Sequence, residues 1–372
     1  MRELLVCMAL CVSVLAQSAL EQAVSLARQK RYSEAAKLLK GVSEPAQTNQ
    51  RIAFHRLKAA IASGLGEQRA AAREMRLALE LAPEDRNMVL ATAVAEFQAG
   101  LLDDARRHAE SAGETPLAKS LIGDIAEERG NFPEAVRAYE AAVALAPYRE
   151  QYRVDLAFEW IKHQAFGPAT DLLEKSVPLF PPSAKLRTLL GIAQYAEGQT
   201  KDAATTFEEA IAADPKFESA YRCLALVVLQ SSAAPLKSTV QRLCGFDQVV
   251  CDALKLRMAR ESGDSTLMQQ AIAGLKRTAP GNVIGRCELA RAYEWTGQLG
   301  QARTEMEACV KLDPIPQNYY RLGLLYKKLG LTELARREME LRNQALETAS
   351  EQTALGLDAL RTFESRRSKW SQ

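Results

Sequence analysis

Apolar residues along this chain recur with the spacing of helices rather than of strands. In the stretch GNFPEAVRAYEAAVALAP, from Gly130 to Pro147, Ala135 and Tyr139 are four residues apart and so share one face of a helix. Ala, Leu, Glu, Arg and Gln, which favour helices, are abundant, whereas the Val, Ile and Thr runs that strands need are scarce. The pattern predicts an all-α protein.

An interval of 34 residues relates prolines, glycines and alanines along the chain. Gly is expected where one helix ends and the chain reverses, because Gly tolerates positive φ. Ala is expected where two antiparallel helices cross closely, and Pro where the second helix stops. Each unit is therefore predicted to be a hairpin of two helices with apolar faces. The residues in this register are Pro147, Pro181 and Pro215; Pro280 and Pro314; Gly66 and Gly100; Gly263 and Gly297; and Ala71, Ala105, Ala135, Ala203, Ala302 and Ala335, each five residues after a Gly.

This pattern resembles the tetratricopeptide repeat, a 34-residue helical hairpin. In one copy, Leu190, Gly191, Gly198, Ala203, Phe207, Ala210 and Pro215 all match the family pattern. The resemblance implies an all-α, right-handed superhelical solenoid of antiparallel helix hairpins, with about eight or nine repeats. The copies are Ala19–Val42, Ile52–Asp85, Arg86–Thr115, Pro116–Arg149, Glu150–Ser183, Ala184–Phe217, Val249–Asn282, Val283–Pro316 and Gln317–Ala349.

One unit departs from the repeat. After a good first helix, the segment that contains Pro235 lacks both the hinge Gly and the crossing Ala, so a bend or a division of the array is expected there. The organisation that follows is a signal peptide at 1–16, a degenerate first repeat at 17–51, an N-terminal half of the array at 52–217, an irregular repeat at 218–248, a C-terminal half at 249–349, and a capping helix and tail at 350–372.

The first residues have the layout of a secretory signal peptide. One early Arg precedes an apolar run from Leu4 to Ala16, and Val14 and Ala16 stand at the −3 and −1 positions of a cut before Gln17. The run is too short for an ordinary transmembrane helix, and a buried first helix is the alternative. We expect export, to a bacterial periplasm or outside the cell, without a lipid anchor or stable membrane insertion.

Charge and motifs leave little room for chemistry. A net charge of +2 gives no reason to expect a nucleic-acid partner. His55, His108 and His163 are the only histidines, and they fall at unrelated repeat positions, so neither a catalytic cluster nor a metal site is expected. No phosphate-binding loop or hydrolase motif is present. The sequence predicts a protein that is not an enzyme and that holds no cofactor.

Five cysteines follow the leader. Cys244 and Cys309 share position 27 of their repeats, and Cys223 and Cys287 lie early in the preceding first helices. Antiparallel packing would bring Cys223 near Cys244 and Cys287 near Cys309, as disulfides within a hairpin that persist only after export. Cys251 offers a competing partner for Cys244. Position 27 could also simply favour a small apolar residue.

Stacked hairpins create a concave face lined by first helices. In the resembled family this groove usually binds peptides, and its positions here would be apolar in the middle and basic-aromatic towards the C-terminus. The Lys and Asn pattern of the clamp for chaperone C-termini is absent, so that partner is not predicted. The expected groove residues are Phe97, Phe158, Ile161, Ile192, Tyr195, Leu226 and Leu229, followed by Arg257, Arg260, Arg291, Trp295, Tyr320, Lys327 and Lys328.

The function expected from these features is a non-catalytic scaffold or assembly factor that binds a peptide or protein segment in its groove. The alternative is a subunit of an envelope or secretion complex that handles a glycan or anionic polymer, since Arg and Lys beside Trp and Tyr suit such ligands. An uncleaved leader would instead favour a cytoplasmic adaptor.

Overall fold

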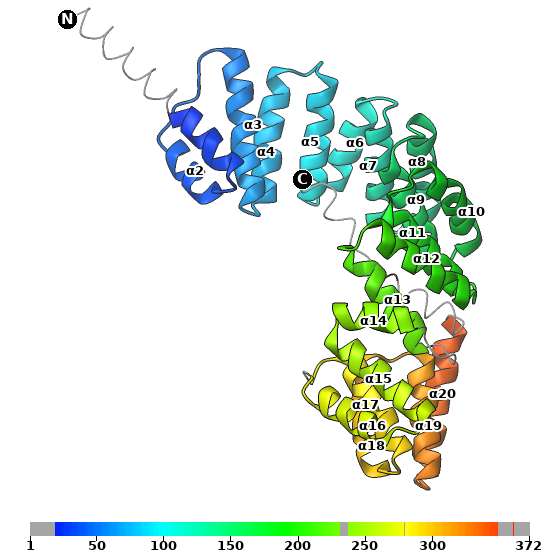
Figure 1. Ribbon diagram of the computed structural model, residues 1–372. Coiled ribbons are helices and arrows are strands. Elements are labelled where there is room, and N and C mark those ends of the chain that lie inside the picture. Colours follow the sequence, from blue (N-terminus) through cyan, green and yellow to red (C-terminus); the bar gives the residue numbers. More distant parts are fainter. Residues whose placement is uncertain (1–18, 231–236, 279, 349–359, 361–372) are drawn as a thin grey trace, which may run out of the picture. The chain divides into compact units, whose positions relative to one another are not determined.

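The computed structural model describes residues 19–230, 237–278, 280–348 and 360 of the 372-residue chain. Every element within these ranges is a helix, and they contain no strand (Figure 1). None of the helices described is both long and apolar enough to cross a membrane. The predicted signal peptide lies outside the described residues, as does the predicted capping helix apart from Leu360.

The chain divides into two compact units between residues 152 and 153. This division precedes the irregular segment 218–248, which lies inside the second unit. In the N-terminal unit, α3 and α4, α5 and α6, and α7 and α8 pack as antiparallel hairpins. Its elements are a helical stretch at 19–28, α2 (Tyr32–Leu39), α3 (Thr48–Gly64), α4 (Gln68–Leu81), α5 (Arg86–Gln98), α6 (Leu102–Ser111), α7 (Pro116–Glu128) and α8 (Phe132–Leu145).

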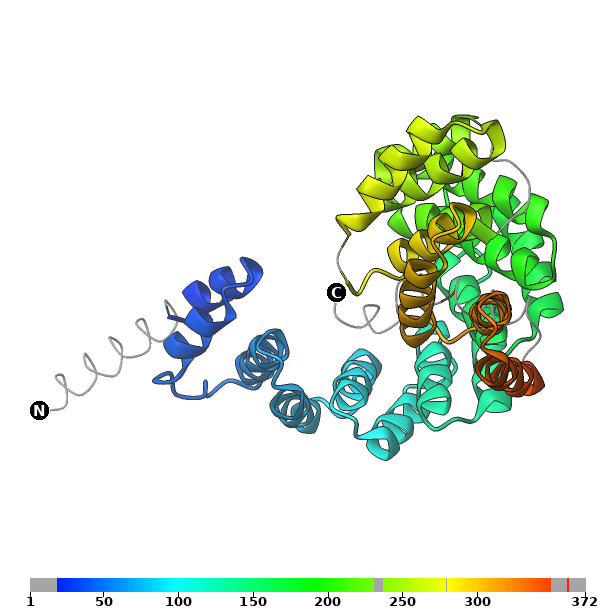
Figure 2. The same cartoon turned by 90° about the horizontal axis from the view of Figure 1, so that it is seen from below.

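The C-terminal unit is built around one hydrophobic core, whose buried members run from Val154 to Leu360. Figure 2 shows its helices from below. Its elements are α9 (Glu150–Lys162), α10 (Phe166–Ser176), a 3-10 turn (Val177–Leu179), α11 (Ala184–Ala196), α12 (Thr200–Ala213), α13 (Glu218–Gln230), α14 (Lys237–Phe246), α15 (Gln248–Ser262), α16 (Ser265–Lys276), α17 (Val283–Trp295), α18 (Leu299–Leu312), α19 (Pro316–Lys328) and α20 (Thr332–Thr348).

From α3 to α20, the hairpin turns that the structure describes are left-handed helix ends. The residue at the turn has positive φ, for example +71° at Gly130, and the following amide of Asn131 donates to the carbonyl of Ala126 at 2.8 Å. This geometry satisfies carbonyls that the helix end would leave unpaired. The predicted role of the repeated glycines is therefore confirmed. In the α9–α10 hairpin, Gln164 takes the same conformation, with φ +63°.

Close helix crossing depends on a second set of glycines. A Cβ built on Gly191 of α11 would lie 2.6 Å from the ring of Phe207 on α12, and one on Gly123 of α7 would lie 2.5 Å from the ring of Tyr139 on α8. Both rings are fully buried. The absence of a side chain at the glycine thus lets a large aromatic residue fill the space between two helices.

Most first helices of the hairpins begin with a side-chain cap. Asp85, Thr115, Ser183, Asp247 and Asn282 each accept a hydrogen bond from a backbone amide in the first turn of the helix that follows. Such a cap contributes about 1 kcal/mol to helix stability. These caps fix where the five helices that they precede start.

The irregular segment disturbs one hairpin. Helix α13 packs on α11 and α12, as a regular first helix would, but α14 packs mainly on α15 rather than on α13. Residues 231–236, which contain Pro235, lie outside the described residues. In the described part of the chain, α13 and α14 therefore do not pack as closely as the helices of the other hairpins.

Candidate functional site

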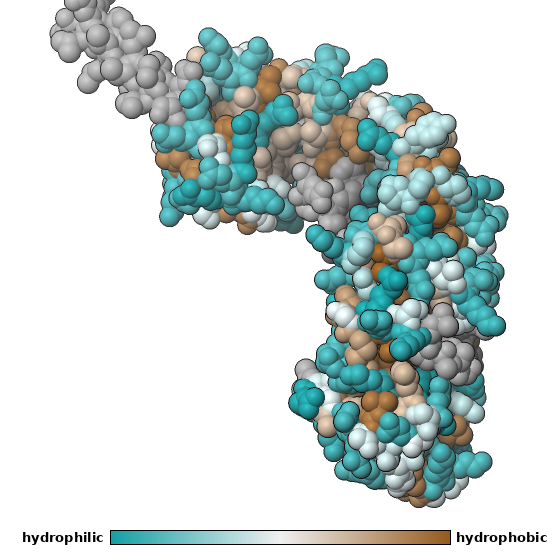
Figure 3. Space-filling model, in the orientation of Figure 1, coloured by the Kyte–Doolittle hydropathy of each residue, from teal (hydrophilic) through white to brown (hydrophobic). Residues whose placement is uncertain are grey.

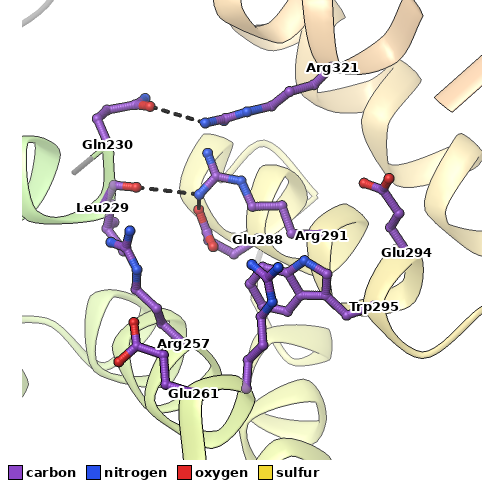
Figure 4. A pocket seen from close by; sticks show the side chains of 10 residues that line it. Leu229, Gln230, Arg257, Glu261, Glu288, Arg291, Glu294, Trp295 and Arg321 are labelled. Carbon is purple, nitrogen blue, oxygen red and sulfur yellow. Dashed lines mark hydrogen bonds and ion pairs between the residues drawn. The ribbon is translucent and has the colours of Figure 1, made fainter. Parts of the chain in front are cut away.

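A cavity of about 600 Å³ opens between the first helices of four successive hairpins in the C-terminal unit. Figure 4 shows side chains from α13, α15, α17 and α19 pointing into it. We call it the arginine pocket, because four arginines line it. Its residues are Leu229, Gln230, Arg257, Arg260, Glu261, Glu288, Arg291, Glu294, Trp295 and Arg321.

The repeat interval brings these side chains together. Arg257 and Arg291 are 34 residues apart, as are Arg260 and Glu294, and Glu261 and Trp295. Equivalent positions on stacked first helices face the same side, so the two residues of each pair lie on neighbouring helices and line the same pocket. The α13 end closes the pocket, because Arg291 lies 3.4 Å from the Leu229 carbonyl oxygen and Arg321 lies 3.4 Å from the Gln230 side-chain oxygen.

Arg257 is half-buried, and its guanidinium donates to the backbone carbonyl of Val228. Burial lowers the pKa of Arg257, because removal from water disfavours the charged form. Glu288 and Glu261 oppose this shift from a distance, without an ion-pair contact to Arg257 in the described residues. Among the described residues, the Arg257 guanidinium therefore donates to a neutral carbonyl rather than to a carboxylate, and two glutamates favour its charge only from a distance.

Glu288 and Arg291 form a buried ion pair one helical turn apart on α17. Burial raises the pKa of the Glu288 carboxyl, and the nearby guanidinium groups of Arg291 and Arg257 oppose that rise. Arg291 thus has its own carboxylate within the pocket. The pair fixes the Arg291 guanidinium against the Leu229 carbonyl at the pocket wall.

The far wall of the pocket combines a cation and an aromatic ring. The Arg260 guanidinium carbon lies 4.3 Å from the ring centroid of Trp295, which is a cation–π contact between α15 and α17. Glu294, one residue before Trp295, forms an ion pair with Lys328 of α19. Neither Arg260 nor Arg321 contacts a carboxylate in the part of the chain that the structure describes.

A second cavity, of about 320 Å³, adjoins the arginine pocket. The two share Leu229, Gln230, Glu288, Arg291 and Arg321 as a common wall. Beyond this wall the lining is mainly apolar, with Arg222, Asp247, Asp313 and Asn318 as its polar members, and we call this second cavity the apolar pocket. Its apolar lining consists of Ala225, Leu226, Leu229, Phe246, Val250, Val283, Ile284, Cys287 and Leu312.

Five of the predicted groove residues meet in the arginine pocket, namely Leu229, Arg257, Arg260, Arg291 and Trp295. A sixth, Leu226, lines the apolar pocket. Sequence reasoning missed the pocket residues Gln230, Glu261, Glu288, Glu294 and Arg321. The repeat interval could have found Arg321, Glu261 and Glu294, since each occupies a groove position of its repeat.

Other predicted groove residues lie elsewhere. Ile161 and Ile192 are 0% exposed and Tyr195 is 4% exposed, so the expectation that these three line an open groove is corrected. Helices α11 and α13 pack on each other, and apolar side chains between first helices are covered by that contact. Tyr320 is exposed but faces Arg342 of α20, with the guanidinium 5.1 Å from its ring centroid.

The remaining groove predictions lie outside both cavities. Phe97, in the N-terminal unit, and Phe158 are half-buried against core residues. Lys327 and Lys328 are exposed at the end of α19. The predicted groove residues that line a common cavity are therefore those in the region between α13 and α19.

The cysteines pair within the C-terminal unit. Cys287 of α17 is bonded to Cys309 of α18, and Cys244 of α14 is bonded to Cys251 of α15. The expected pair of Cys223 with Cys244 is thus corrected in favour of its competitor, because α14 packs on α15 rather than on α13. Neither disulfide includes Cys223, which is buried in α13.

Each of the three histidines contacts a glutamate. His55 lies 2.8 Å from Glu74, His108 lies 2.7 Å from Glu96, and His163 lies 3.3 Å from Glu159. The glutamate partners of His108 and His163 are completely buried. No group of three or more potential metal ligands occurs among the residues that the structure describes.

Comparison with known families identifies the repeats. Residues 107–150 and 188–235 match one family profile described as tetratricopeptide repeat, and residues 285–316 and 316–341 match a second profile with the same description. The chain therefore contains tetratricopeptide repeats, in both of its compact units. Proteins built from this repeat generally mediate protein–protein interactions and are generally non-catalytic scaffolds. No curated protein matches the chain by sequence.

Solved structures with a similar fold include several repeat proteins of bacteria. A tetratricopeptide repeat protein from Parabacteroides merdae is 12% identical, with a TM-score of 0.45 over 78% of this chain and 98% of that chain. PilF from Pseudomonas aeruginosa is 18% identical, with a TM-score of 0.41 over 61% and 98%. YrrB, described as a TPR protein with an unusual peptide-binding site, is 17% identical, with a TM-score of 0.37 over 50% and 95%.

Proposed function

We propose that this protein is a non-catalytic scaffold or assembly factor that binds a segment of another protein through the first-helix face of its C-terminal unit. The arginine pocket carries the proposal. It gathers charged and aromatic side chains from α15, α17 and α19 around one cavity, next to an apolar pocket. Arg and Trp are among the residues enriched in the energetic centres of protein interfaces.

We also propose that the protein is exported. Two cysteine pairs stand in disulfide contact, and disulfides persist in oxidising compartments such as the periplasm or the extracellular space. Together with the leader-like residues 1–16, they favour a cleaved, exported protein over a cytoplasmic adaptor. Sequencing the N-terminus of the protein purified from its own host would test this, and a mature chain that begins at Met1 would contradict it.

Photo-crosslinking in the native host tests the binding face. A benzoylphenylalanine at Glu261, which is exposed at the rim of the arginine pocket, should crosslink to a discrete protein. The same group at Thr304, which is exposed on the second helix α18, is the matched control and should not. Crosslinks from Thr304 alone, or from neither position, would contradict binding through this face.

A second candidate function is the handling of an anionic polysaccharide. The contact of Arg260 with Trp295 favours it, because a ring beside a cation suits a charged sugar as well as a peptide. Retention of the protein on polygalacturonate at physiological salt, lost after Trp295→Leu, would support this alternative. The apolar pocket that adjoins the arginine pocket does not suit a polysaccharide, so we favour a protein partner.

A further inference from the structure

The arginine pocket contains more positive charge than its own carboxylates neutralise. Four arginines and three glutamates line it. Glu288 is engaged by Arg291 and Glu294 by Lys328, while Arg257, Arg260 and Arg321 have no ion pair in the described residues. These three arginines instead contact a backbone carbonyl, an aromatic ring and a side-chain amide, respectively.

Of the three arginines without an ion pair in the described residues, Arg257 has a charge that burial disfavours. Its side chain is half-buried, and burial lowers its pKa, which means that its environment disfavours the charge. A carboxylate placed beside a desolvated guanidinium restores the lost interaction through short, charge-assisted hydrogen bonds. Guanidinium groups also match the planar geometry of a carboxylate better than an ammonium does.

The apolar pocket restricts what else the ligand contains. It shares five wall residues with the arginine pocket, including Arg291 and Arg321. A ligand that fills both cavities must therefore place an anionic group and an apolar group close together. An Asp or Glu followed closely by a large apolar residue in an extended peptide meets this requirement, because side chains project at short intervals along a strand.

We propose that the partner of this site is an acidic segment within a polypeptide chain. A Glu or Asp side chain of that segment enters the arginine pocket and is held by Arg257 and Arg321, with Arg260 and Trp295 covering it. A neighbouring apolar side chain of the same segment occupies the apolar pocket. The inference rests on the proposed function, and adds to it the chemical class of the partner and the residues that select it.

The probe for this proposal is a set of hexapeptides that are acetylated at the N-terminus and amidated at the C-terminus. Blocked ends ensure that side chains supply every carboxylate. The set combines Glu, Asp, Gln or Asn at one position with Leu, Phe or Ser at the neighbouring positions. Binding to the full, disulfide-bonded chain is measured by fluorescence anisotropy. Peptides that contain both an acid and an apolar neighbour should bind, and replacement of the acid by its amide should weaken binding about tenfold or more.

Variants of the protein test which residues are responsible for the preference between peptides. Arg321→Gln, and the double variant Arg257→Gln with Arg321→Gln, should each lose the preference for acid over amide. Arg321→Lys should retain part of the preference, because it keeps the charge but not the planar fork. The control Arg277→Gln removes an exposed arginine outside both pockets and should bind like the wild type. Ile284→Gln, in the apolar pocket, should instead reduce the preference for Leu or Phe over Ser.

The outcomes separate this inference from the proposed function. Equal binding of acid and amide peptides, or an unchanged preference in the Arg321→Gln variant with a wild-type circular dichroism spectrum, would overturn the acidic partner. If Glu261 still crosslinks to a protein in that case, the scaffold proposal stands alone. Binding of polygalacturonate without binding of any peptide would overturn both.

Discussion

Arg260 and Trp295 lie on the first helices of two successive hairpins, with the guanidinium carbon 4.3 Å from the centroid of the indole ring. The contact joins α15 to α17 at one wall of the arginine pocket. It also shields one face of the ring from solvent. Such a contact contributes about 0.5–1 kcal/mol at an exposed site, so it matters more for the shape of the pocket than for the stability of the fold.

The first prediction concerns this shielding. With Trp160→Phe and Trp370→Phe in the background, Trp295 is the only remaining tryptophan of the three in the chain. Arg260→Gln should then increase quenching of Trp295 fluorescence by acrylamide, because the ring loses its cover. Arg303→Gln, which removes a cation from Tyr326 instead, is the control and should leave the quenching unchanged. Equal quenching in the Arg260→Gln variant would mean that the two residues do not remain in contact in solution.

The second prediction concerns Glu288. Burial raises the pKa of this carboxyl above its ordinary value of 4.5. A carboxyl with a raised pKa in the folded state stabilises that state most when it is protonated, below its pKa in the unfolded chain. This contribution is lost as the pH rises through the raised value. Glu288→Gln cannot ionise, so its free energy of unfolding relative to the wild type should increase as the pH rises above about 4.5.

Urea unfolding followed by circular dichroism, at several pH values between 4.5 and 8, measures this difference. We expect the Glu288→Gln variant to gain stability relative to the wild type across that range, because the wild type must ionise a carboxyl whose pKa burial has raised. Glu261→Gln, at the exposed rim of the same pocket, is the control. A constant difference between Glu288→Gln and the wild type would show that the carboxyl titrates alike in folded and unfolded chains.

The repeat interval was enough to predict the hairpins, because each recurring residue has a structural role that depends only on nearby residues of its own repeat. Gly130 occupies a left-handed turn, and Ala135 and Tyr139 are buried where α7 and α8 cross. These turn and crossing positions are set by residues of the same repeat, which lie at fixed spacings along the sequence. The same repeat spacing predicts that Arg257 and Arg291, which are 34 residues apart, lie on the same side of neighbouring first helices.

The parts that could not be predicted depend on contacts between repeats. Ile161 and Ile192 occupy groove positions, yet packing between first helices such as α11 and α13 covers apolar side chains of that register. The partner of Cys244 depends on α14 turning towards α15, which no single repeat specifies. Glu288 was missed because it is the sixth residue of its repeat, which is not one of the groove positions, although it lines both cavities.

The third prediction tests the close crossing of α11 and α12. Gly191→Ala places a methyl group within 2.6 Å of the Phe207 ring, so one of the two must move. We expect a loss of about 1–3 kcal/mol in the free energy of unfolding, the usual effect of overpacking a core. In Phe207→Leu the space is larger, so Gly191→Ala should destabilise that background less.

A glycine without such a neighbour gives the matched control. A Cβ on Gly300, inside the exposed part of α18, would meet nothing within 4 Å. Gly300→Ala should therefore stabilise the protein by roughly 0.5–1 kcal/mol through helix propensity. Stabilisation by Gly191→Ala as well would show that the two helices are not in the close contact described.

The fourth prediction concerns the disulfides. Trypsin cleaves after Arg242 and Lys255, so Cys244 and Cys251 remain in one peptide, whereas Cys287 and Cys309 fall in peptides 287–291 and 304–311. Without reduction, mass spectrometry should find 243–255 lighter by two hydrogens, and 287–291 joined to 304–311. A peptide that joins Cys223 to Cys244 would contradict the pairing. Replacing Cys287 and Cys309 by Ala should destabilise the oxidised protein by about 3 kcal/mol, since that bond closes a loop of 22 residues.

The last prediction concerns Gln164, the residue other than Gly that has positive φ at a hairpin turn in the described part of the C-terminal unit. Gln164 has φ +63°, a conformation that Gly adopts without the steric penalty of a Cβ. Gln164→Gly should therefore raise the free energy of unfolding by about 1 kcal/mol, after the extra freedom of Gly in the unfolded chain is included. Gln164→Ala keeps the Cβ and should leave stability close to that of the wild type. Urea unfolding of the three proteins measures both differences. Equal stability of the Gly and Ala variants would show that the α9–α10 turn relaxes out of the left-handed conformation, which would also release the hydrogen bond from the Ala165 amide to the Trp160 carbonyl.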